Sequence, residues 1–275
     1  MSQPKPISIL NARILLLVFF LLIFSKQKAY SQFGFSHEVG LITGPVVFYS
    51  DFGQRNNFET NAKNTGIGFG LIHYLNFSYR ADCNCYTRDK YFNDHFKVRN
   101  EIDYHKTNLE HFGRWVEPDE TSLFADQLRA MGGSVSVFEI GSQLEYFPFS
   151  IRDFMAGGFK IAPFISLGVH YVNFDPEIES SFGPLNTPVS TPDKYYNSFQ
   201  QDPGSTWAVV ASVGIRYKLT PLSDLMLDSR WEHYFSDYVD GLNPSFENNG
   251  TKQVPENKAN EWIYWLNIGY IYYID

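Results

Sequence analysis

The chain has 275 residues, with 22 basic and 30 acidic side chains, a net charge of −8 and an aromatic content of 17%. Proteins bind nucleic acid by neutralising phosphates with Lys and Arg, so this acidic balance argues against a nucleic-acid partner. The length suits one large all-β domain, because such domains commonly reach this size undivided.

The N-terminal segment has the composition of a secretory signal peptide. Basic residues precede an apolar run over residues 14–24, which is shorter than the roughly 20 residues of a membrane-spanning helix. Small residues stand at Ala29 and Ser31, where a signal peptidase reads the chain. We predict that residues 1–31 are removed and that residues 32–275 form the mature domain; an uncleaved signal anchor is the alternative. An exported chain this rich in aromatic residues is either a soluble protein of an oxidising compartment or a transmembrane barrel.

Eight segments of the chain alternate between apolar and polar residues. Successive side chains of a strand point to opposite faces, so this period of two predicts strands with one apolar and one polar face. In chain order the segments are residues 37–50, 65–79, 96–105, 134–147, 162–174, 206–219, 225–235 and 261–275. Most of them are long enough to cross a bilayer at a tilt, which takes about 9 to 11 residues.

The connections between these segments differ in length. Residues 220–224 form a tight turn, whereas residues 106–133, 175–205 and 236–260 form long connections at the other end of the strands. Outer-membrane barrels have short periplasmic turns, long extracellular loops and an even number of strands. The first pair of connections departs from this pattern, because residues 51–64 are no more numerous than residues 80–95. We predict an eight-stranded antiparallel up-and-down transmembrane β-barrel with long extracellular loops; a soluble barrel is the alternative.

Aromatic residues mark the ends of several apolar faces. Amphipathic rings at both ends of a lipid-facing stripe form the interfacial girdles of membrane barrels. The predicted girdle consists of Trp207, Tyr217, Trp231, Trp262, Tyr264, Tyr270 and Tyr272. If the apolar faces contact lipid, the polar faces line the lumen.

The predicted lumen carries charges of both signs. Its charge network consists of Lys97, Arg99, Glu101, Asp103, Glu139, Glu145, Arg216, Lys218, Asp228, Arg230 and Glu232, with Glu38 as a further acid. Buried charges must be paired, and side chains can fill the interior of an eight-stranded barrel. We therefore predict a plugged interior rather than a pore.

Two cysteines, Cys83 and Cys85, follow the second predicted strand. A disulfide is the usual state of cysteines in an oxidising compartment, although bridging residues two apart requires unusual geometry. A metal site with His95 as third ligand is an alternative, but the spacing of a four-ligand site is absent. The absence of any special role is the third option.

Two further patterns have a structural and a functional interpretation. Gly66, Gly68 and Gly70 lack the spacing of a nucleotide-binding loop and lie within a strand, so we expect them to make room for large lumen side chains. Glu101, Asp103 and His105 share one face and are the usual kinds of proton-transfer group. No serine nucleophile in a recognisable setting accompanies them, so we expect no enzyme and assign no catalytic residue.

The long connection before the fourth predicted strand contains a helical pattern over residues 119–131. Leu123, Phe124, Leu128 and Met131 form a predicted apolar face, with Gly132 and Gly133 as a stop signal. This helix either covers the mouth of the barrel or docks a partner.

Several segments resemble a family of outer-membrane barrels from Bacteroidota, chiefly flavobacteria. They include "FGFSHEVGLITGPVVFYSDFG", "NTGIGFGLIHYLNFSYRADCNCYT", "SLFADQLRAMGG", "IGSQLEYFPFSIRDF" and "SVGIRYKLTPLSDLMLDSRW". More distantly, the glycine-rich second strand and the segments "QLEYF" and "APFISLGV" are similar to PorG-type barrels of the type IX secretion and gliding apparatus. This resemblance implies a role in envelope assembly or secretion and supplies no catalytic residues.

The sequence therefore predicts a protein of the cell outer membrane, in contact with outer-membrane lipid. We expect a structural or partner-docking role in a cell-envelope machine, with type IX secretion and outer-membrane protein assembly as candidates. A narrow channel or ligand-binding barrel and a lumen-sited lipid-modifying enzyme are the alternatives. We expect no cofactor and no metal.

Overall fold

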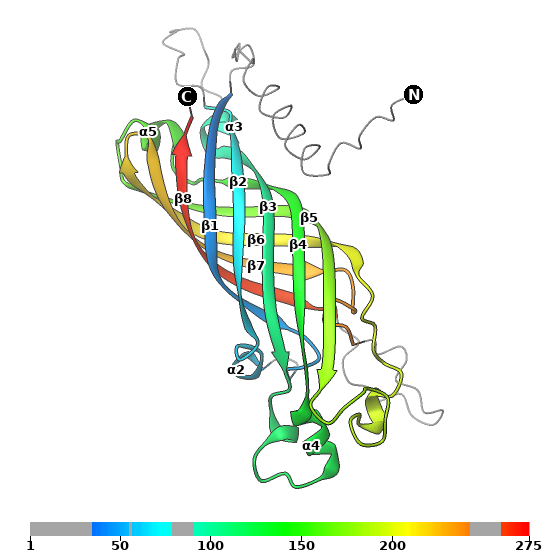
Figure 1. The fold of residues 1–275 in the computed structure, drawn as a ribbon. Coiled ribbons are helices and arrows are strands. Elements are labelled where there is room, and N and C mark those ends of the chain that lie inside the picture. Colours follow the sequence, from blue (N-terminus) through cyan, green and yellow to red (C-terminus); the bar gives the residue numbers. More distant parts are fainter. Residues whose placement is uncertain (1–34, 55–56, 79–90, 243–259, 275) are drawn as a thin grey trace, which may run out of the picture. The chain divides into compact units, whose positions relative to one another are not determined.

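The computed structural model describes residues 35–54, 57–78, 91–242 and 260–274. The predicted signal peptide, Cys83 and Cys85 lie outside these residues. Eight strands form a closed antiparallel barrel in the order β1 to β8, in which each strand pairs with its sequence neighbours and β8 pairs with β1 (Figure 1). The predicted fold is confirmed.

The strands match the eight predicted segments and extend several of them. Their bounds are β1 Ser36–Tyr49, β2 Thr65–Asn76, β3 Phe96–Glu110, β4 Met131–Tyr146, β5 Ile161–Ser180, β6 Gly204–Thr220, β7 Ser223–Tyr234 and β8 Trp262–Tyr273. Short helices lie in the connections: α2 Phe58–Asn61, α3 Tyr91–His95, η1 Arg114–Val116, α4 Leu123–Ala130, α5 Ile151–Met155 and η2 Asp193–Tyr195. Among the described residues, no helix is long and apolar enough to span a membrane.

The two ends of the barrel differ. At the end where β1 begins and β8 ends, here called the terminal end, only a two-residue turn separates β6 from β7. The opposite end, here called the loop end, carries α2, η1, α4 and η2 in its longer connections (Figure 1). This agrees with the predicted asymmetry of the connections.

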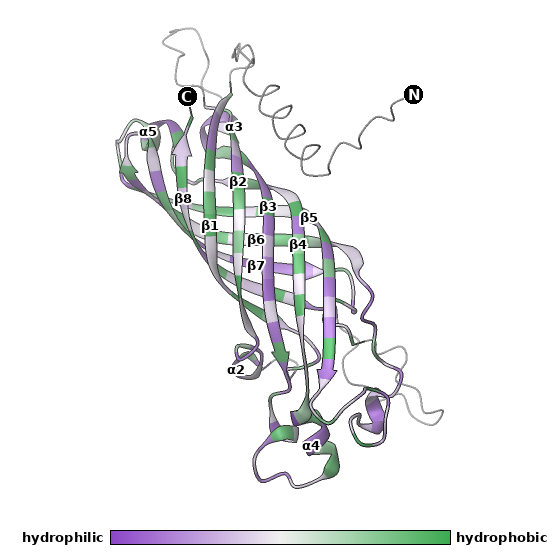
Figure 2. Cartoon of the chain, viewed as in Figure 1, coloured by the Kyte–Doolittle hydropathy of each residue, from purple (hydrophilic) through white to green (hydrophobic). Residues whose placement is uncertain are grey.

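The middle of the barrel is apolar outside and polar inside. On β6, for example, Val213 and Ile215 are 54% and 42% exposed, whereas Arg216 is fully buried. Figure 2 shows the resulting alternation of hydrophobic and hydrophilic residues along the strands. A closed barrel satisfies every strand's hydrogen bonds and can present apolar side chains to lipid.

Towards the loop end this pattern is reversed. The outward residues of β5 change from Val169 and Tyr171 to the acidic Asp175 and Glu177, while the inward Ile178 is buried. Figure 2 shows hydrophilic residues at the loop end of β5. The predicted segments 96–105 and 162–174 end before β3 and β5 do. They were defined by an apolar outer face, which these strands lose towards the loop end. Parts of the predicted loops 106–133 and 175–205 are therefore strand.

Apolar side chains close the barrel at both ends. At the terminal end, α5 buries Ile151, Phe154 and Met155. At the loop end, buried apolar residues come from several connections and strand ends: Phe48, Phe52, Tyr195, Val239 and Leu242. The polar part of the lumen thus lies between two apolar layers.

The predicted helix before the fourth strand is present as α4. The Ser122 side chain caps it by accepting a hydrogen bond from the Ala125 N–H. Leu128, on the inner face of the helix, is buried. The predicted stop signal was wrong, because Gly132 and Gly133 lie inside β4, which begins directly after the helix at Met131. Extended backbone at Met131 ends the helix instead.

Candidate functional site: the charge network of the lumen

The structure places every residue of the predicted charge network inside the barrel. Each of these side chains is buried and at most 8% exposed: Lys97, Arg99, Glu101, Asp103, Glu139, Glu145, Arg216, Lys218, Asp228, Arg230 and Glu232. Alternation along β3, β4, β6 and β7 points them inwards, and the closure of the barrel brings them together. Figure 1 shows how these strands enclose one lumen.

One group of charges lies near the terminal end. Lys97 Nζ donates a hydrogen bond to Glu38 Oε1 over 2.6 Å, and Arg216 pairs with the other oxygen of Glu38. Asp224 lies 3.2 Å from Lys218 Nζ and 3.4 Å from Arg216 Nε. These five residues are called the terminal cluster below.

Asp224 was predicted to lie in the tight turn 220–224, and this prediction is wrong. Strand β7 begins at Ser223, so the Asp224 side chain points into the lumen and is fully buried. Its partners Arg216 and Lys218 lie on the neighbouring strand β6. Tyr273 Oη also donates a hydrogen bond to Asp224 Oδ2 over 2.5 Å.

A second group surrounds two arginines in the middle of the barrel. Arg99 contacts Glu101 at 2.9 Å, Asp228 at 3.0 Å and Glu145 at 3.1 Å. The second arginine, Arg230, contacts Asp103 at 2.9 Å and Glu232 at 3.2 Å, and it also pairs with Glu101. Each guanidinium thus joins carboxylates from several strands, which is the geometry in which arginine pairs best.

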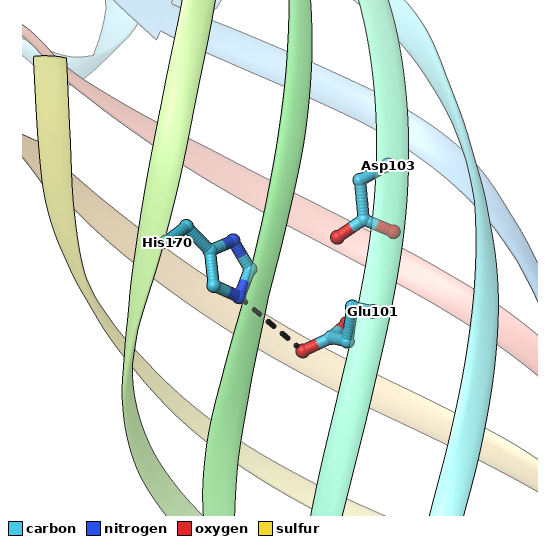
Figure 3. Close-up of side chains that lie close together, drawn as sticks. All are labelled: Glu101, Asp103 and His170. Atoms are coloured by element: carbon cyan, nitrogen blue, oxygen red, sulfur yellow. Dashed lines mark ion pairs between the residues drawn. The ribbon is translucent and has the colours of Figure 1, made fainter.

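His170 of β5 lies between two sets of carboxylates. Its Nε2 faces Glu101 (Figure 3) and lies 3.5 Å from Oε1, and its Nδ1 lies 3.0 Å from Glu139 Oε2. The imidazole lies over Gly141, where an added Cβ atom would overlap the ring. A side chain at position 141 would therefore displace His170.

His170 lies in the predicted strand 162–174 and is not part of the predicted charge network. The residue stands alone among small residues in its segment, so no local pattern marks it. Pairing of β4 with β5 puts it opposite Gly141 and beside the carboxylates of β3 and β4. Only its inward place in the alternation of the segment could have pointed to it from the sequence.

Within the described residues, the polar contacts of His105 are with Tyr234 and Glu139 rather than with Glu101 and Asp103. Its Nε2 lies 3.2 Å from Tyr234 Oη and 3.6 Å from Glu139 Oε1. Tyr234 Oη in turn donates to Glu139 Oε1 over 2.9 Å. A spacing of two places Glu101, Asp103 and His105 on the same face of β3. The partners of His105 nevertheless come from other strands.

The charges of this middle region are unbalanced. The ten residues called the central cluster are Arg99, Glu101, Asp103, His105, Glu139, Glu145, His170, Asp228, Arg230 and Glu232. Within the described part of the chain, this cluster has six carboxylates for two guanidinium groups, and its two remaining members are imidazoles. Unpaired buried carboxylates are costly, so protons or a bound cation must offset the difference.

The predicted girdle residues lie on the outer wall near both ends of the apolar belt. Trp207 and Tyr171 are paired across β5 and β6, with ring centroids 5.2 Å apart, and Trp231 and Tyr264 are 5.3 Å apart. Trp262 stacks on Tyr49, and the exposed Tyr217, Tyr270 and Tyr272 lie towards the terminal end. A closed barrel with this outer belt and a charged interior is an outer-membrane β-barrel.

His95, the third ligand of the alternative cysteine metal site, has other contacts. Its Nδ1 lies 2.6 Å from the Phe147 carbonyl oxygen, and its ring stacks on Tyr91. The two cysteines of that alternative, and of the disulfide alternative, are outside the described residues.

No family model matches the chain, and a search of curated proteins finds no similar sequence. The solved structures that resemble it include a major outer membrane protein from Thermus thermophilus, with 12% identity, 87% of this chain and 100% of that chain covered, and a TM-score of 0.45. Neisserial surface protein A has 12% identity, covers 86% and 96% of the two chains, and gives a TM-score of 0.43. Ail of Yersinia pestis has 12% identity, covers 86% of this chain and 99% of its own, and gives a TM-score of 0.38.

Proposed function

We propose that the protein is a structural, partner-docking component of a cell-envelope machine in the outer membrane. The observation that carries this proposal is the filled lumen. Charged side chains occupy its middle, and apolar side chains from the connections lie at both ends. A barrel filled in this way supports its surroundings through its surfaces rather than by conducting solutes.

Exposed apolar side chains outside the membrane belt support docking. In the β3–β4 connection, Trp115 is 47% exposed and Leu123 is 63% exposed, on neighbouring η1 and α4. These residues lie beyond Glu110, where the outer wall has become polar, so lipid does not cover them. Exposed apolar groups at such positions mark contact sites for other proteins.

The process that we propose for this role is type IX secretion. The likeness of the strand segments to PorG-type barrels supports it, and outer-membrane protein assembly is the other process compatible with the sequence.

The test is affinity purification of the full chain from native membranes after mild cross-linking. We expect subunits of the type IX secretion apparatus to co-purify with the wild type and to be lost, by about tenfold or more, with Trp115→Ser/Leu123→Ser. The matched control is Asp119→Ala/Glu120→Ala, which changes exposed polar residues of the same connection. It is expected to retain the partners.

Two results would overturn the proposal. One is co-purification that the apolar substitutions leave unchanged, since the docking surface would then lie elsewhere. The other is clear unitary conductance of the purified protein in a planar lipid bilayer, which would favour the channel alternative. Recovery of barrel-assembly subunits in place of secretion subunits would reassign the process.

A further inference from the structure

We propose that the central cluster contains a binding site for one divalent transition-metal ion, with Glu139, His170 and Glu232 as ligands. Each of these residues offers one ligand atom, and the three atoms lie within 4.8 Å of one another. All three side chains are buried, and they come from three different strands, β4, β5 and β7. No metal was expected from the sequence, where the only site weighed was the cysteine pair with His95.

The distances suit a tetrahedral ion such as Zn²⁺. His170 Nδ1 lies 3.0 Å from Glu139 Oε2 and 3.9 Å from Glu232 Oε2. Zinc binds imidazole nitrogen and carboxylate oxygen at about 2.0–2.2 Å, so neighbouring ligand atoms of a tetrahedron are about 3.3 Å apart. Small side-chain rotations bring the observed atoms to that separation. Imidazole nitrogen and carboxylate oxygen are both zinc ligands, and three protein ligands leave the fourth position open to water.

The Glu232 oxygen that faces this site, Oε2, lies towards Glu139, with which Glu232 can share a proton. Glu232 is 1% exposed, and its Oε2 is a buried acceptor without a hydrogen-bond donor. Its other oxygen, Oε1, accepts from Arg230 over 3.2 Å. A buried carboxylate oxygen without a partner is costly, and a cation would satisfy it.

The outer atoms of all three ligands are already held by a second set of residues. Tyr234 Oη donates to Glu139 Oε1, and Arg230 donates to Glu232 Oε1. Glu101 lies 3.5 Å from His170 Nε2, on the far side of the ring from the proposed ion (Figure 3). Metal-binding histidines commonly donate their second N–H to a carboxylate, which fixes the tautomer and orients the ring.

The other face of His170 is less suitable for a cation. Glu101 and Asp103 also lie near this histidine. Glu101, however, already pairs with Arg99 and Arg230 and accepts from Gln143. Two guanidinium groups beside it repel a cation and occupy its oxygens. This face therefore supports the histidine, and the Glu139–Glu232 face binds the ion.

Ion binding would also reduce the charge imbalance of the central cluster. An imidazolium at His170 carries a proton on each nitrogen, facing Glu139 and Glu101; the ion replaces the Nδ1 proton, Nε2 keeps its own, and a charge of +2 is added between two carboxylates. Because the Nδ1 proton is released, the affinity falls as the pH is lowered. The competing arrangement is a proton shared by Glu139 and Glu232.

The test is metal stoichiometry of the refolded full chain. The protein carries a histidine-free tag and Cys83→Ser/Cys85→Ser, so that neither tag nor thiols bind the probe. It is refolded into detergent micelles with Zn²⁺, desalted, and measured by inductively coupled plasma mass spectrometry. We expect one zinc per chain in this background, and retained zinc lower by at least about tenfold when His170→Gln or Glu232→Gln is added.

Asp240→Asn is the matched control. It makes the same carboxylate-to-amide change in a buried residue outside the central cluster, whose partners are the Asp51 and Leu242 N–H groups, so it should bind zinc like the wild type. Gly141→Ala changes no ligand, but its Cβ atom would overlap both the His170 ring and the Val169 carbonyl oxygen, so the folded variant should lose the ion. Stoichiometric zinc that persists unchanged in His170→Gln contradicts the proposal, and so does a wild type that refolds with Zn²⁺ and retains none.

Heat-dependent electrophoretic mobility shows which variants have folded. If the ligand variants do not fold, X-ray absorption of the zinc-loaded wild-type lumen decides. A first shell with one imidazole and oxygen ligands supports the site, whereas oxygen ligands alone overturn it.

Discussion

Glu38 is the residue on which the terminal cluster depends most. It pairs with both Lys97 and Arg216, and all three side chains are buried. Removing one partner of a buried ion pair leaves an uncompensated charge, which costs about 3–5 kcal/mol. We expect Glu38→Gln to lower the free energy of unfolding by this amount, as measured by urea titration in lipid vesicles.

The control for this prediction is Glu59→Gln. Glu59 is an exposed residue of α2, and such surface changes usually stay within about 0.5 kcal/mol. Equal stability of Glu38→Gln and the wild type would mean that the terminal cluster does not hold the barrel together in the way described.

The glycines of β2 leave space in the lumen for large side chains. A Cβ atom at Gly68 would come within 2.6 Å of the Trp265 ring, and Trp265 is fully buried. The expectation that the glycines of β2 leave space is consistent with this contact. The neighbour could not be named from the sequence, because it lies on β8, two strands away around the closed barrel.

At the scale of elements, the β7–β8 connection is joined to the β1–β2 connection through buried acids. Asp240 Oδ2 accepts from the Asp51 N–H and Oδ1 from the Leu242 N–H, each over 2.9 Å. Burial raises the pKa of Asp240 to about 6, from an ordinary value of 3.8. Burial, together with the nearby Asp240, Asp51 and Asp237, likewise raises the pKa of Glu261.

These raised pKa values predict how the loop end responds to pH. An acid that binds its proton more tightly when folded contributes its stability below about pH 4 and loses it as the pH rises through about 6. We expect the free energy of unfolding of the wild type to fall relative to Asp240→Asn between pH 4 and pH 7. The difference is up to about 3 kcal/mol, at about 1.4 kcal/mol per pKa unit.

Urea unfolding of both proteins at several pH values measures this difference. Taking the difference between the two proteins removes the titration of groups that they share, apart from the coupled Glu261. Parallel pH profiles would show that Asp240 is not buried as described.

The strands themselves were largely predictable from the sequence. A period of two is a local property, so the existence and facing of all eight strands followed from residue order. The extended part of β5 was not predicted, since its outward residues are acidic and its inward ones apolar. That is the pattern of a soluble strand, and it shows where the wall leaves the membrane.

At the scale of the whole molecule, the apolar belt makes a prediction about its surroundings. We expect spin labels at Val213 and Ile215 to contact lipid, because both side chains point outwards in the belt. Labels at Glu177 and Glu179 point outwards from the extended part of β5 and should contact water. Relaxation by oxygen and by a water-soluble nickel complex distinguishes the two environments in reconstituted vesicles.

Labels at Ser166 and Ser212 provide the inward comparison, since these small lumen residues are buried. They should be accessible to neither reagent. Water contact at Val213 or lipid contact at Glu177 would contradict the assignment of the belt.

The sequence by itself determined the number of strands, their faces and the charged character of the lumen, because alternation along one strand needs no partner. Only the tertiary structure decided which charges meet. His170 reaches Glu101 and Glu139, and Asp224 reaches Arg216, through the register of a closed barrel. That register depends on strand tilt and closure, which are properties of the whole sheet. The order of residues along one strand therefore does not determine it.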